Sequence, residues 1–282
     1  MNDAKLPPAE NARPSPESPS KLLKEILRQK GWTQTYFAER LGLHPSAFSM
    51  ILREERQLPR GKILRLSEIT GNPPKFWEDR IREYAEYVAT PQGMLAKALS
   101  RANESLGKAG LSDQLVPGLM ADHQILKAIQ LGELQLIPFD PNQVQSSSID
   151  LYLGAIEGMD DETAEGVIEE KGALFTLKKG KMAVARSLEK ISLSKKLVGR
   201  VGIPTALARL GCIVTYGLQI DPGYEGNLLV TIWNPVADDC ELIVGKTKIL
   251  SIEMTVLNLP AMRSIKEIRP DEFGDIPTTP IT

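Results

Sequence analysis

The stretch GLQIDPGYEGNLLVTIWN, residues 217–234, contains the pattern that decides the fold of the larger part of the chain. A short apolar run ends at Asp221, the turn-forming pair Pro222-Gly223 follows, and a second apolar run occupies Leu228 to Trp233. Proline and glycine are the residues that tight turns favour. The pattern therefore predicts two strands, with the carboxylate of Asp221 held at the end of the first.

The same character extends outward from Met120 to about residue 258. Short runs rich in Val, Ile and Leu recur between Gly and Pro at intervals of about ten residues, which is typical of an all-β barrel or sandwich. A helix is expected over Asp122 to Leu131, a strand from Leu134, and a surface loop over the acidic stretch from Glu157 to Lys171. The further runs that we expect to be strands are Ala183–Ala185, Val198–Val201, Cys212–Tyr216, Leu228–Trp233 and Lys248–Val256.

Toward the N-terminus the chain becomes helical. Residues 1–19 carry five prolines among small polar residues and are expected to be a disordered tail. Helical periodicity starts at Ser20, a candidate N-cap, and short helices separated by glycines continue to about Tyr87. We therefore predict an α+β chain with two domains. The expected segments are the tail 1–19, an all-α domain at 20–90, a helical linker at 91–117, a β domain at 118–260 and a C-terminal tail at 261–282.

Length and composition agree with two domains. The chain has 282 residues and a mass of 31.1 kDa, with 42% hydrophobic and 25% charged residues. It contains no apolar run of the roughly 18 residues that a membrane span needs and no secretory signal pattern. The two cysteines, Cys212 and Cys240, match no metal or redox spacing, and two histidines are too few for a His-rich metal site. We expect a cytoplasmic protein with reduced cysteines, no metal site and no membrane contact.

The charge is unevenly distributed. Residues 20–90 contain 13 Lys and Arg against 9 Asp and Glu, a net charge of +4. The remaining residues contain 21 against 27, a net charge of −6. A basic N-terminal part joined to an acidic remainder suggests that one part meets a polyanion, although ordinary surface variation gives the same numbers.

The segment TQTYFAERLGLHPSAFSMIL, residues 33–52, has the physical pattern of a helix-turn-helix. Ala38 is small where two helices cross closely, and Gly42 lies at the tight turn four residues later. Phe48 and Ile51 are the apolar anchors of the second helix, and Thr33 is placed to cap the first. These five positions resemble the pattern of the Xre/Cro-type helix-turn-helix family.

The resemblance continues through GKILRLSEITGNPPKFWEDRIREY, residues 61–84, which is similar to the HigA-type antitoxin branch. In that branch a Thr-Gly-x-x-x-x-Phe-Trp step leads into a last helix. Taken as residues alone, Phe76 and Trp77 are most simply core residues that close a five-helix domain.

The recognition helix is expected from Pro45 to Leu52. It contains no Arg, Gln or Asn, so base reading would depend on Ser and apolar contacts, with Arg53 and Arg56 near phosphates. His44 is interpreted as a cap or a phosphate neighbour rather than a metal ligand. The alternative is a helical protein-interaction domain. The residues expected to contact DNA are Gln34, His44, Ser46, Ala47, Ser49, Met50 and Arg53.

Three stretches of the β domain resemble, in order, three motifs of the dCTP deaminase/dUTPase superfamily. They are SSSIDLYLG at 146–154, GRVGIPTALARLG at 199–211 and GLQIDPGYEGNLLVTIWN at 217–234. The resemblance implies a distorted β-barrel, commonly trimeric, with nucleotide sites between subunits. It also implies that Asp221 orients the attacking water in the dUTPase branch, that Tyr224 packs on deoxyribose, and that Arg209 lies near the site. Asp150 matches a residue of supportive role.

The departures from that family decide the chemistry. The second motif normally has Arg-Ser-Ser or Arg-Ser-Gly, but this chain has Pro204-Thr205-Ala206, which keeps one hydroxyl and loses the phosphate-binding Arg. The deaminase general base is a Glu, whereas the aligned residue here is Thr231. The glycine-rich C-terminal arm of dUTPases is also missing. We therefore expect deamination to be disabled, while Asp221 keeps diphosphohydrolysis open; alternatively, Asp221 and the glycines only shape the turn.

Together these features predict a DNA-binding transcriptional regulator, antitoxin-like and repressing its own promoter. Its degenerate β domain would oligomerise the chain, as a trimer or hexamer with paired helix-turn-helix domains, and sense dUTP or dCTP. The alternatives are an active dUTP diphosphatase or dCTP deaminase carrying a DNA-binding domain, and an antitoxin whose main partner is a toxin. No cofactor is required, and Mg²⁺ is expected only with a bound nucleotide. The expected nucleotide contacts are Thr205, Arg209, Asp221 and Tyr224.

Overall fold

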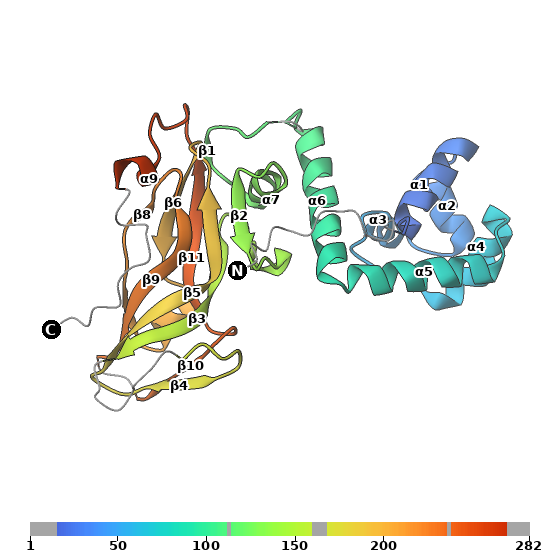
Figure 1. The fold of residues 1–282 in the computed structure, drawn as a ribbon. Coiled ribbons are helices and arrows are strands. Elements are labelled where there is room, and N and C mark those ends of the chain that lie inside the picture. Colours follow the sequence, from blue (N-terminus) through green and yellow to red (C-terminus); the bar gives the residue numbers. More distant parts are fainter. Residues whose placement is uncertain (1–15, 112–113, 160–167, 236–237, 270–282) are drawn as a thin grey trace, which may run out of the picture. The chain divides into compact units, whose positions relative to one another are not determined.

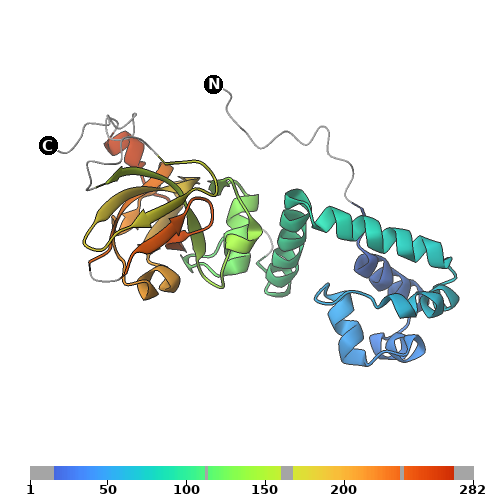
Figure 2. The same ribbon diagram turned by 90° about the horizontal axis from the view of Figure 1, so that it is seen from below.

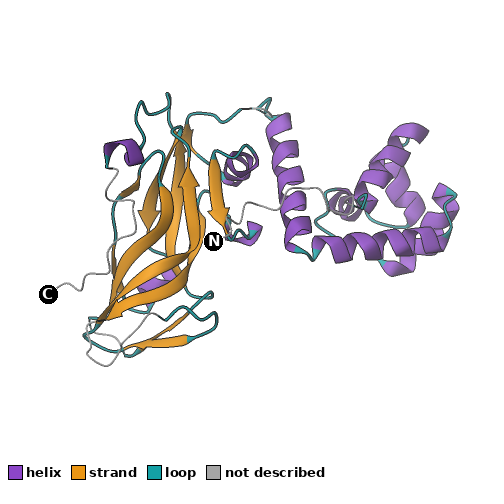
Figure 3. Cartoon of the chain, in the orientation of Figure 1, coloured by secondary structure: helices purple, strands orange, loops and turns teal. Residues whose placement is uncertain are grey.

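The computed structural model describes residues 16–111, 114–159, 168–235 and 238–269. The chain divides into two compact units, Met1–Met94 and Leu95–Thr282 (Figure 1). The first unit is helical and the second is dominated by strands, and each has its own apolar core (Figure 3). This confirms the predicted α+β class. Residues 1–15 of the expected N-terminal tail, 160–167 of the acidic stretch and 270–282 of the expected C-terminal tail lie outside the described residues.

The helical unit starts earlier than the sequence indicated. The prediction that Ser20 is the N-cap is wrong, because Ser18 caps the first helix by accepting a hydrogen bond from the Ser20 amide at 3.2 Å. Pro19 takes the first helical position, where its missing N–H costs nothing. Ser20 is buried and donates its hydroxyl hydrogen to the Ile51 carbonyl at 2.9 Å. The helices of this unit are α1 (Pro19–Lys30), α2 (Gln34–Leu41), α3 (Pro45–Leu52), the 3-10 helix η2 (Arg60–Lys62), α4 (Ile63–Thr70) and α5 (Pro74–Val88).

The turn between α2 and α3 follows the predicted chemistry. Thr33 caps α2 by accepting from the Tyr36 amide at 3.2 Å. Gly42 ends α2 with φ +69°, and its amide donates to Glu39, while the Leu43 amide donates to Ala38. This bond pair is a Schellman motif, which needs a left-handed residue at its centre. The five expected positions therefore form a helix-turn-helix.

Apolar contacts hold α3 against α2. Ala38 and Phe48 are fully buried and Ile51 is 3% exposed. The rings of Phe37 and Phe48 stack with their centroids 5.1 Å apart. Trp77 is also fully buried, and its indole N–H donates to Thr70 Oγ1 at 3.1 Å, so it closes the helical core as expected.

Helix α6 (Pro91–Lys108) occupies most of the segment that we expected to link the domains. Its residues Ala102 and Leu106 are buried at 4% and 0% exposure. Lys127 Nζ donates to Asn103 Oδ1 at 3.4 Å. The segment is therefore a packed helix rather than an exposed connection. None of the helices in the described ranges combines the length and apolarity that crossing a membrane requires.

The second unit is a curled antiparallel sheet of nine strands, accompanied by a two-stranded sheet of β10 and β4 (Figures 1 and 2). Its main path runs β7-β9-β5-β3-β11-β6-β8, with β1 paired to β11 and β2 to β5. Its elements are β1 (Gly118–Leu119), α7 (Asp122–Gln130), β2 (Leu134–Ile137), the 3-10 helix η3 (Pro141–Gln143), β3 (Ile149–Met159), β4 (Leu174–Leu177), β5 (Met182–Leu193), β6 (Leu197–Gly202), α8 (Thr205–Arg209), β7 (Ile213–Thr215), β8 (Gln219–Ile220), β9 (Glu225–Trp233), β10 (Cys240–Ile243), β11 (Lys248–Val256) and α9 (Ile265–Ile268).

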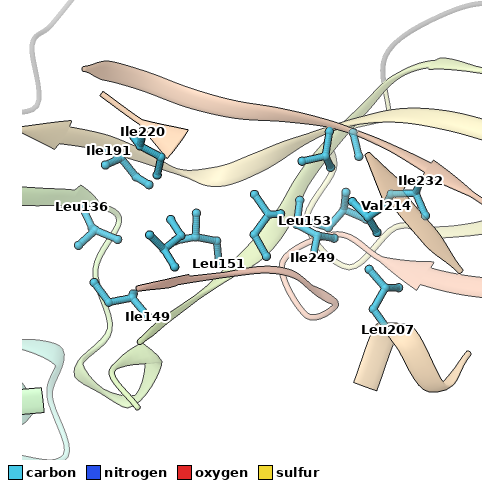
Figure 4. Close-up of a cluster of buried hydrophobic side chains, with 14 of the residues drawn as sticks. Leu136, Ile149, Leu151, Leu153, Ile191, Leu207, Val214, Ile220, Ile232 and Ile249 are labelled. Carbon is cyan, nitrogen blue, oxygen red and sulfur yellow. The ribbon is translucent and has the colours of Figure 1, made fainter. Parts of the chain in front are cut away.

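Alternation along the strands builds the core. Every second residue of β5 from Ala183 to Leu193 is buried, as expected for a strand with one face on the interior. Leu151, Leu153 and Ile249 meet in the middle of this core, and Leu207 of α8 points into it (Figure 4). Trp233 lies on the outer face of β9 and is 43% exposed.

The expected C-terminal tail begins with packed structure. Ser264 caps α9 and forms a capping box with Glu267, and Ile265 is 8% exposed. The Ile265 amide donates to the Pro222 carbonyl at 3.0 Å. Residues 264–269 are therefore part of the β unit.

The Gly42 turn gives a direct test of the helical unit. We expect Gly42→Ala to lower its free energy of unfolding by about 1–2 kcal/mol, because an L-residue is strained at this φ. The added Cβ would also meet Lys62 Nζ at 3.1 Å and Arg65 at 3.2 Å. Denaturant unfolding of the full chain, followed by circular dichroism, measures the change.

Gly61→Ala is the matched control. A Cβ at Gly61 has nothing within 4 Å and no positive φ to strain it. Its unfolding free energy should stay at the wild-type value or rise slightly. Equal losses from both substitutions would contradict the assignment of the Gly42 turn.

Candidate DNA interface and nucleotide site

Helix α3 occupies the range predicted for the recognition helix, Pro45–Leu52. Phe48, Ile51 and Leu52 are buried. The residues predicted to contact DNA lie elsewhere on its surface and at its ends. Gln34, His44, Ser46, Met50 and Arg53 are exposed, whereas Ala47 and Ser49 are half-buried.

His44 has the capping role that we expected. Its Nδ1 accepts a hydrogen bond from the Ser46 amide at 3.4 Å and lies 2.7 Å from Ser46 Oγ.

Two cations beside the turn were not singled out by the sequence analysis. Lys62 Nζ and an Arg65 guanidinium nitrogen both lie within about 3.2 Å of the position that a Cβ on Gly42 would take. Neither forms an ion pair with any side chain in the described ranges. Two neighbouring cations without a carboxylate favour an anionic partner, and phosphate oxygens provide that charge in DNA. The basic run from Arg60 to Arg65 was the sequence signal that could have identified these two cations.

A carboxylate fixes the turn that leaves α3. Glu54 has φ +61°, an uncommon value for a residue other than glycine. Its carboxylate accepts hydrogen bonds from Tyr84 at 2.7 Å and from Ser18. Contacts from both ends of the unit therefore hold the backbone between Arg53 and Arg56. No local pattern in the sequence indicates these contacts.

The Asp221 turn has the geometry that the sequence indicated. The Tyr224 amide donates to the Asp221 carbonyl at 3.0 Å, with Pro222 and Gly223 between them and Gly223 at φ +79°. This is the residue pattern of a type II turn. The Asp221 carboxylate is half-buried and accepts from Gln219 Nε2 at 2.6 Å.

Tyr224 is committed to internal contacts. Its hydroxyl donates to the Asn227 carbonyl at 2.7 Å, and its ring packs against the core of the β unit. Burial raises the pKa of the phenol to about 12, so it remains protonated at neutral pH. The side chain is therefore fixed in position, which suits a surface on which a sugar can pack.

Helix α9 covers the Asp221 turn. A Cβ on Gly223 would lie 2.4 Å from the Ser264 Cβ, so only glycine allows this close approach. Glu225 forms ion pairs with Lys190 at 2.8 Å and with Lys266, and Glu267 pairs with Lys195 at 2.7 Å. The hydrogen bonds from Lys190 and Lys266 lower the pKa of Glu225 to about 2. These contacts attach α9 to the β unit.

Helix α8 carries the other predicted nucleotide contacts. Pro204 is its buried N-cap, Leu207 anchors it in the core, and Thr205 and Arg209 are exposed. Arg209 makes no ion pair with the described residues. The segment offers one hydroxyl and one guanidinium, but no group replaces the phosphate-binding arginine at Pro204.

The structure does not bring the two halves of the predicted site together within one chain. The Asp221 turn precedes the first residue of β9, whereas α8 leads into β7, which pairs with β9 at Thr231 and Trp233. Glu225 and Thr231 are separated by roughly 20 Å along the strand at ~3.3 Å per residue. Strands β6 and β8 show the same separation. Gly199 of β6 pairs with Ile220, next to the Asp221 turn, and β6 then runs away from the turn toward α8.

Thr231 lies on the outer face of β9 and is half-buried. Its cross-strand neighbours are Val184 on β5 and Thr215 on β7. None of the three side chains can accept a proton at neutral pH. The position aligned with the deaminase base, and its two partners in the sheet, therefore provide no general base.

Asp150, for which the resemblance implies a supporting role, forms an ion pair inside the β unit. It is 7% exposed and accepts from Lys248 Nζ at 2.7 Å. The adjacent Glu189 is 1% exposed and accepts from Gln143 at 2.6 Å and from the Tyr152 amide at 3.0 Å. Burial raises the pKa of Glu189. This polar network fixes η3 and β3 to β5. Within the described ranges, no three His, Cys, Asp or Glu side chains cluster as metal ligands.

The pairing of Glu225 predicts a pH-dependent stability. Its pKa is depressed from 4.5 to about 2 in the folded chain, so its stabilising contribution is complete above pH 4.5 and is lost as the pH falls toward 2. We expect Glu225→Gln to cost about 1 kcal/mol above pH 4.5, because both pairs are solvent-exposed, and progressively less below it. Unfolding free energies measured across this range test the expectation.

Glu241→Gln is the control for this experiment. Glu241 lies exposed on β10 and has no ion pair among the described residues. Its substitution should change stability little at any pH. A Glu225→Gln deficit that stays constant down to pH 2 would show that the ion pairs are not its cause.

Comparison with known proteins agrees with this division of the chain. Residues 119–238 match the sequence model of the family described as dCTP deaminase-like, and residues 23–77 match one described as helix-turn-helix. A dCTP deaminase, dUMP-forming, from Salinispora tropica is 33% identical over 132 residues, which cover 41% of this chain and 68% of that protein. The protein of the same name from Corynebacterium kroppenstedtii is 32% identical over 148 residues, covering 45% and 79%.

Among solved structures, the 2'-deoxycytidine 5'-triphosphate deaminase from Agrobacterium tumefaciens matches with 18% identity and a TM-score of 0.41. That match covers 50% of this chain and 49% of the other. The sequence relationships show that this chain belongs to the dCTP deaminase-like family and carries an N-terminal helix-turn-helix domain.

Proposed function

We propose that this protein is a transcriptional regulator whose dCTP deaminase-like unit oligomerises and binds a pyrimidine deoxynucleotide without deaminating it. The observation that carries the proposal is the setting of Thr231. Deaminases of this family need a carboxylate there, and this chain has a threonine flanked by Val184 and Thr215. A domain that keeps the Asp221 turn but lacks the base is suited to binding rather than turnover.

The DNA contact would be made by α3 and the cations around it. Met50 and Ala47 are suited to apolar contact with thymine methyl groups, and Ser46 and Ser49 to hydrogen bonding with base edges. Arg53, Lys62 and Arg65 would contact phosphates and set the register. Because α3 carries no bidentate base reader, we expect modest sequence discrimination per unit and a strong dependence on pairing two units on one operator.

The separation of α8 from the Asp221 turn supports a homo-oligomer. A nucleotide that contacts Arg209 and Tyr224 at once must receive them from two copies of the chain, because one copy holds them at opposite ends of β9. The sites would then lie between subunits, in a trimer or in a hexamer that pairs the helix-turn-helix domains. Mg²⁺ would enter with the nucleotide phosphates, and the protein would act in the cytoplasm.

Regulation would follow from a population shift. A nucleotide bound between subunits stabilises one arrangement of the copies over others. Paired recognition helices fit half-sites about 34 Å apart, so a change in arrangement alters the affinity for DNA. The nucleotide and the operator are then coupled ligands, and each changes the binding of the other by the same factor.

Arg65→Ala tests the DNA interface. We expect it to weaken operator binding several-fold and to reduce the slope of log affinity against log salt by roughly 0.9 for each bound helix-turn-helix unit, because one phosphate contact is lost. Fluorescence anisotropy on a DNA fragment selected by the full-length protein measures both quantities. The same titration with saturating dUTP or dCTP should shift the affinity.

Arg28→Ala is the charge-matched control, since Arg28 lies exposed on α1 and pairs with Glu25 at 2.8 Å. It should leave the salt slope unchanged. An equal loss in both variants would place Arg65 outside the interface. An affinity that neither nucleotide changes would refute the sensing part of the proposal.

A second candidate function is nucleotide diphosphohydrolysis, and the Asp221 carboxylate favours it. The carboxylate is oriented by Gln219 and remains half-exposed, as a residue that positions a water must be. The curated relatives named above are dUMP-forming deaminases, so loss of the deaminase base would leave the second reaction of such a chain intact.

Incubation of the protein with dCTP and dUTP in Mg²⁺, with the products resolved by chromatography, separates the candidates. We expect both nucleotides to remain unchanged. Thr231→Glu restores a carboxylate at the base position, and dUTP formed from dCTP only by that variant would confirm a pseudoenzyme. Thr215→Glu, which places the carboxylate on the neighbouring strand, should remain inactive. Formation of dUMP from dUTP by the native chain would establish the hydrolase instead.

An antitoxin role is compatible with the regulator. The stretch 61–84 resembles HigA-type antitoxins, and in the structure its Phe76 and Trp77 pack as the edge-to-face pair that closes the helical core. The resemblance therefore rests on residues that stabilise the fold. Co-purification of a small basic protein with the native chain would add a toxin as partner.

A further inference from the structure

Cys212 and Cys240 lie next to each other in the β unit, although 28 residues separate them in the sequence. Their Sγ atoms are 3.2 Å apart, and the side chains are 6% and 3% exposed. Both are free thiols, and they are the two cysteines of the chain. The separation exceeds a disulfide bond of about 2.05 Å by little more than 1 Å.

The two cysteines belong to different layers of the unit. Cys212 follows Gly211, which has φ +78°, in the short connection from α8 to the edge strand β7. Cys240 is the first residue of β10 and pairs with Leu177 in the separate two-stranded sheet (Figure 1). A bond between them would attach the α8–β7 connection to the β10–β4 sheet.

We infer that Cys212 and Cys240 form a reversible intramolecular disulfide when the protein meets hydrogen peroxide. The inference rests on the position of the two thiols and does not require a bound nucleotide. Its consequence is a covalent restraint beside α8, because Cys212 is three residues beyond Arg209. Oxidation would therefore fix the segment that carries Thr205 and Arg209.

The reaction balances in two steps. The Cys212 thiol loses its proton to water, and the thiolate attacks one peroxide oxygen, giving a sulfenic acid and a hydroxide that is protonated to water. The Cys240 sulfur then attacks the sulfenic sulfur, the S–S bond forms, and the second oxygen leaves as water with the proton of Cys240. Two thiols and one peroxide become one disulfide and two waters, and two electrons pass from sulfur to oxygen.

The environment assigns the order of attack. Burial and the neighbouring Cys212 raise the pKa of Cys240. Cys212 is the more exposed of the two and lies beside an edge strand, where a small oxidant has a shorter path. Cys212 is therefore the attacking residue, and Cys240 is the resolving one.

The test is thiol counting on the full-length protein. After hydrogen peroxide treatment and quenching, the chain is denatured, alkylated with N-ethylmaleimide and weighed intact. We expect the treated chain to take no alkyl groups, to be about 2 Da lighter than the reduced chain, and to migrate as a single chain on a non-reducing gel. Dithiothreitol should restore two alkylation sites. The melting temperature of the oxidised form should rise by several degrees, because the crosslink restricts the unfolded chain.

Cys212→Ala and Cys240→Ala control for other oxidation. Treated identically, neither variant should lose about 2 Da or gain thermal stability, whereas methionine oxidation would add mass to all samples. Diamide provides a second oxidant that forms disulfides by another route. Two alkylated thiols after both oxidants, or a crosslink between chains in place of the internal bond, would overturn the inference.

Discussion

The length of strand β9 is the constraint on which the nucleotide site depends. Its first residue follows the Asp221 turn, and its far end pairs with β7, which continues from α8. A strand paired near both ends cannot shorten, and the pairing of β9 with β5 from Met182 to Arg186 and from Lys190 to Ser192 keeps it extended. The residues that would contact one nucleotide are thereby held apart in one chain, and any shared site must combine two copies.

This constraint changes how the missing groups are interpreted. An enzyme that loses its base at Thr231 and its phosphate clamp at Pro204 loses transition-state stabilisation, and each loss costs several kcal/mol. Binding between subunits depends on other contacts, namely the fixed ring of Tyr224, the turn beneath α9 and the guanidinium of Arg209. Under the proposed function, the chain retains groups suited to contact a ligand shared by two copies, and it lacks those that act only in the transition state.

Local chemistry was predictable from the sequence, and long-range contacts were not. The Thr33 cap, the Gly42 turn, the bounds of α3 and the Asp221 turn each depend on a few adjacent residues, so the sequence indicates them correctly. The cap at Ser18 was missed because the proline that follows also fits the end of a disordered tail. Helix α9 and the cysteine pair depend on the approach of Ser264 to Gly223 and of Cys240 to Cys212, which only the folded sheet determines. The positions of Lys62 and Arg65 were also not predictable from local sequence, because the fold places these cations beside Gly42.

The proposed site shared between copies would give the fusion of these two units a physical purpose. A ligand held within one chain can change only that chain, whereas a ligand held between chains changes the free energy of their association. Operator binding by paired helix-turn-helix units also depends on the association of two copies. One α3 offers few base contacts, whereas two copies bound together add their phosphate contacts. Nucleotide and DNA are then coupled through the same quantity, the relative arrangement of the copies, without a contact between the two sites. Coupling of this kind needs no catalysis, and a β unit that released its nucleotide after turnover would lose it.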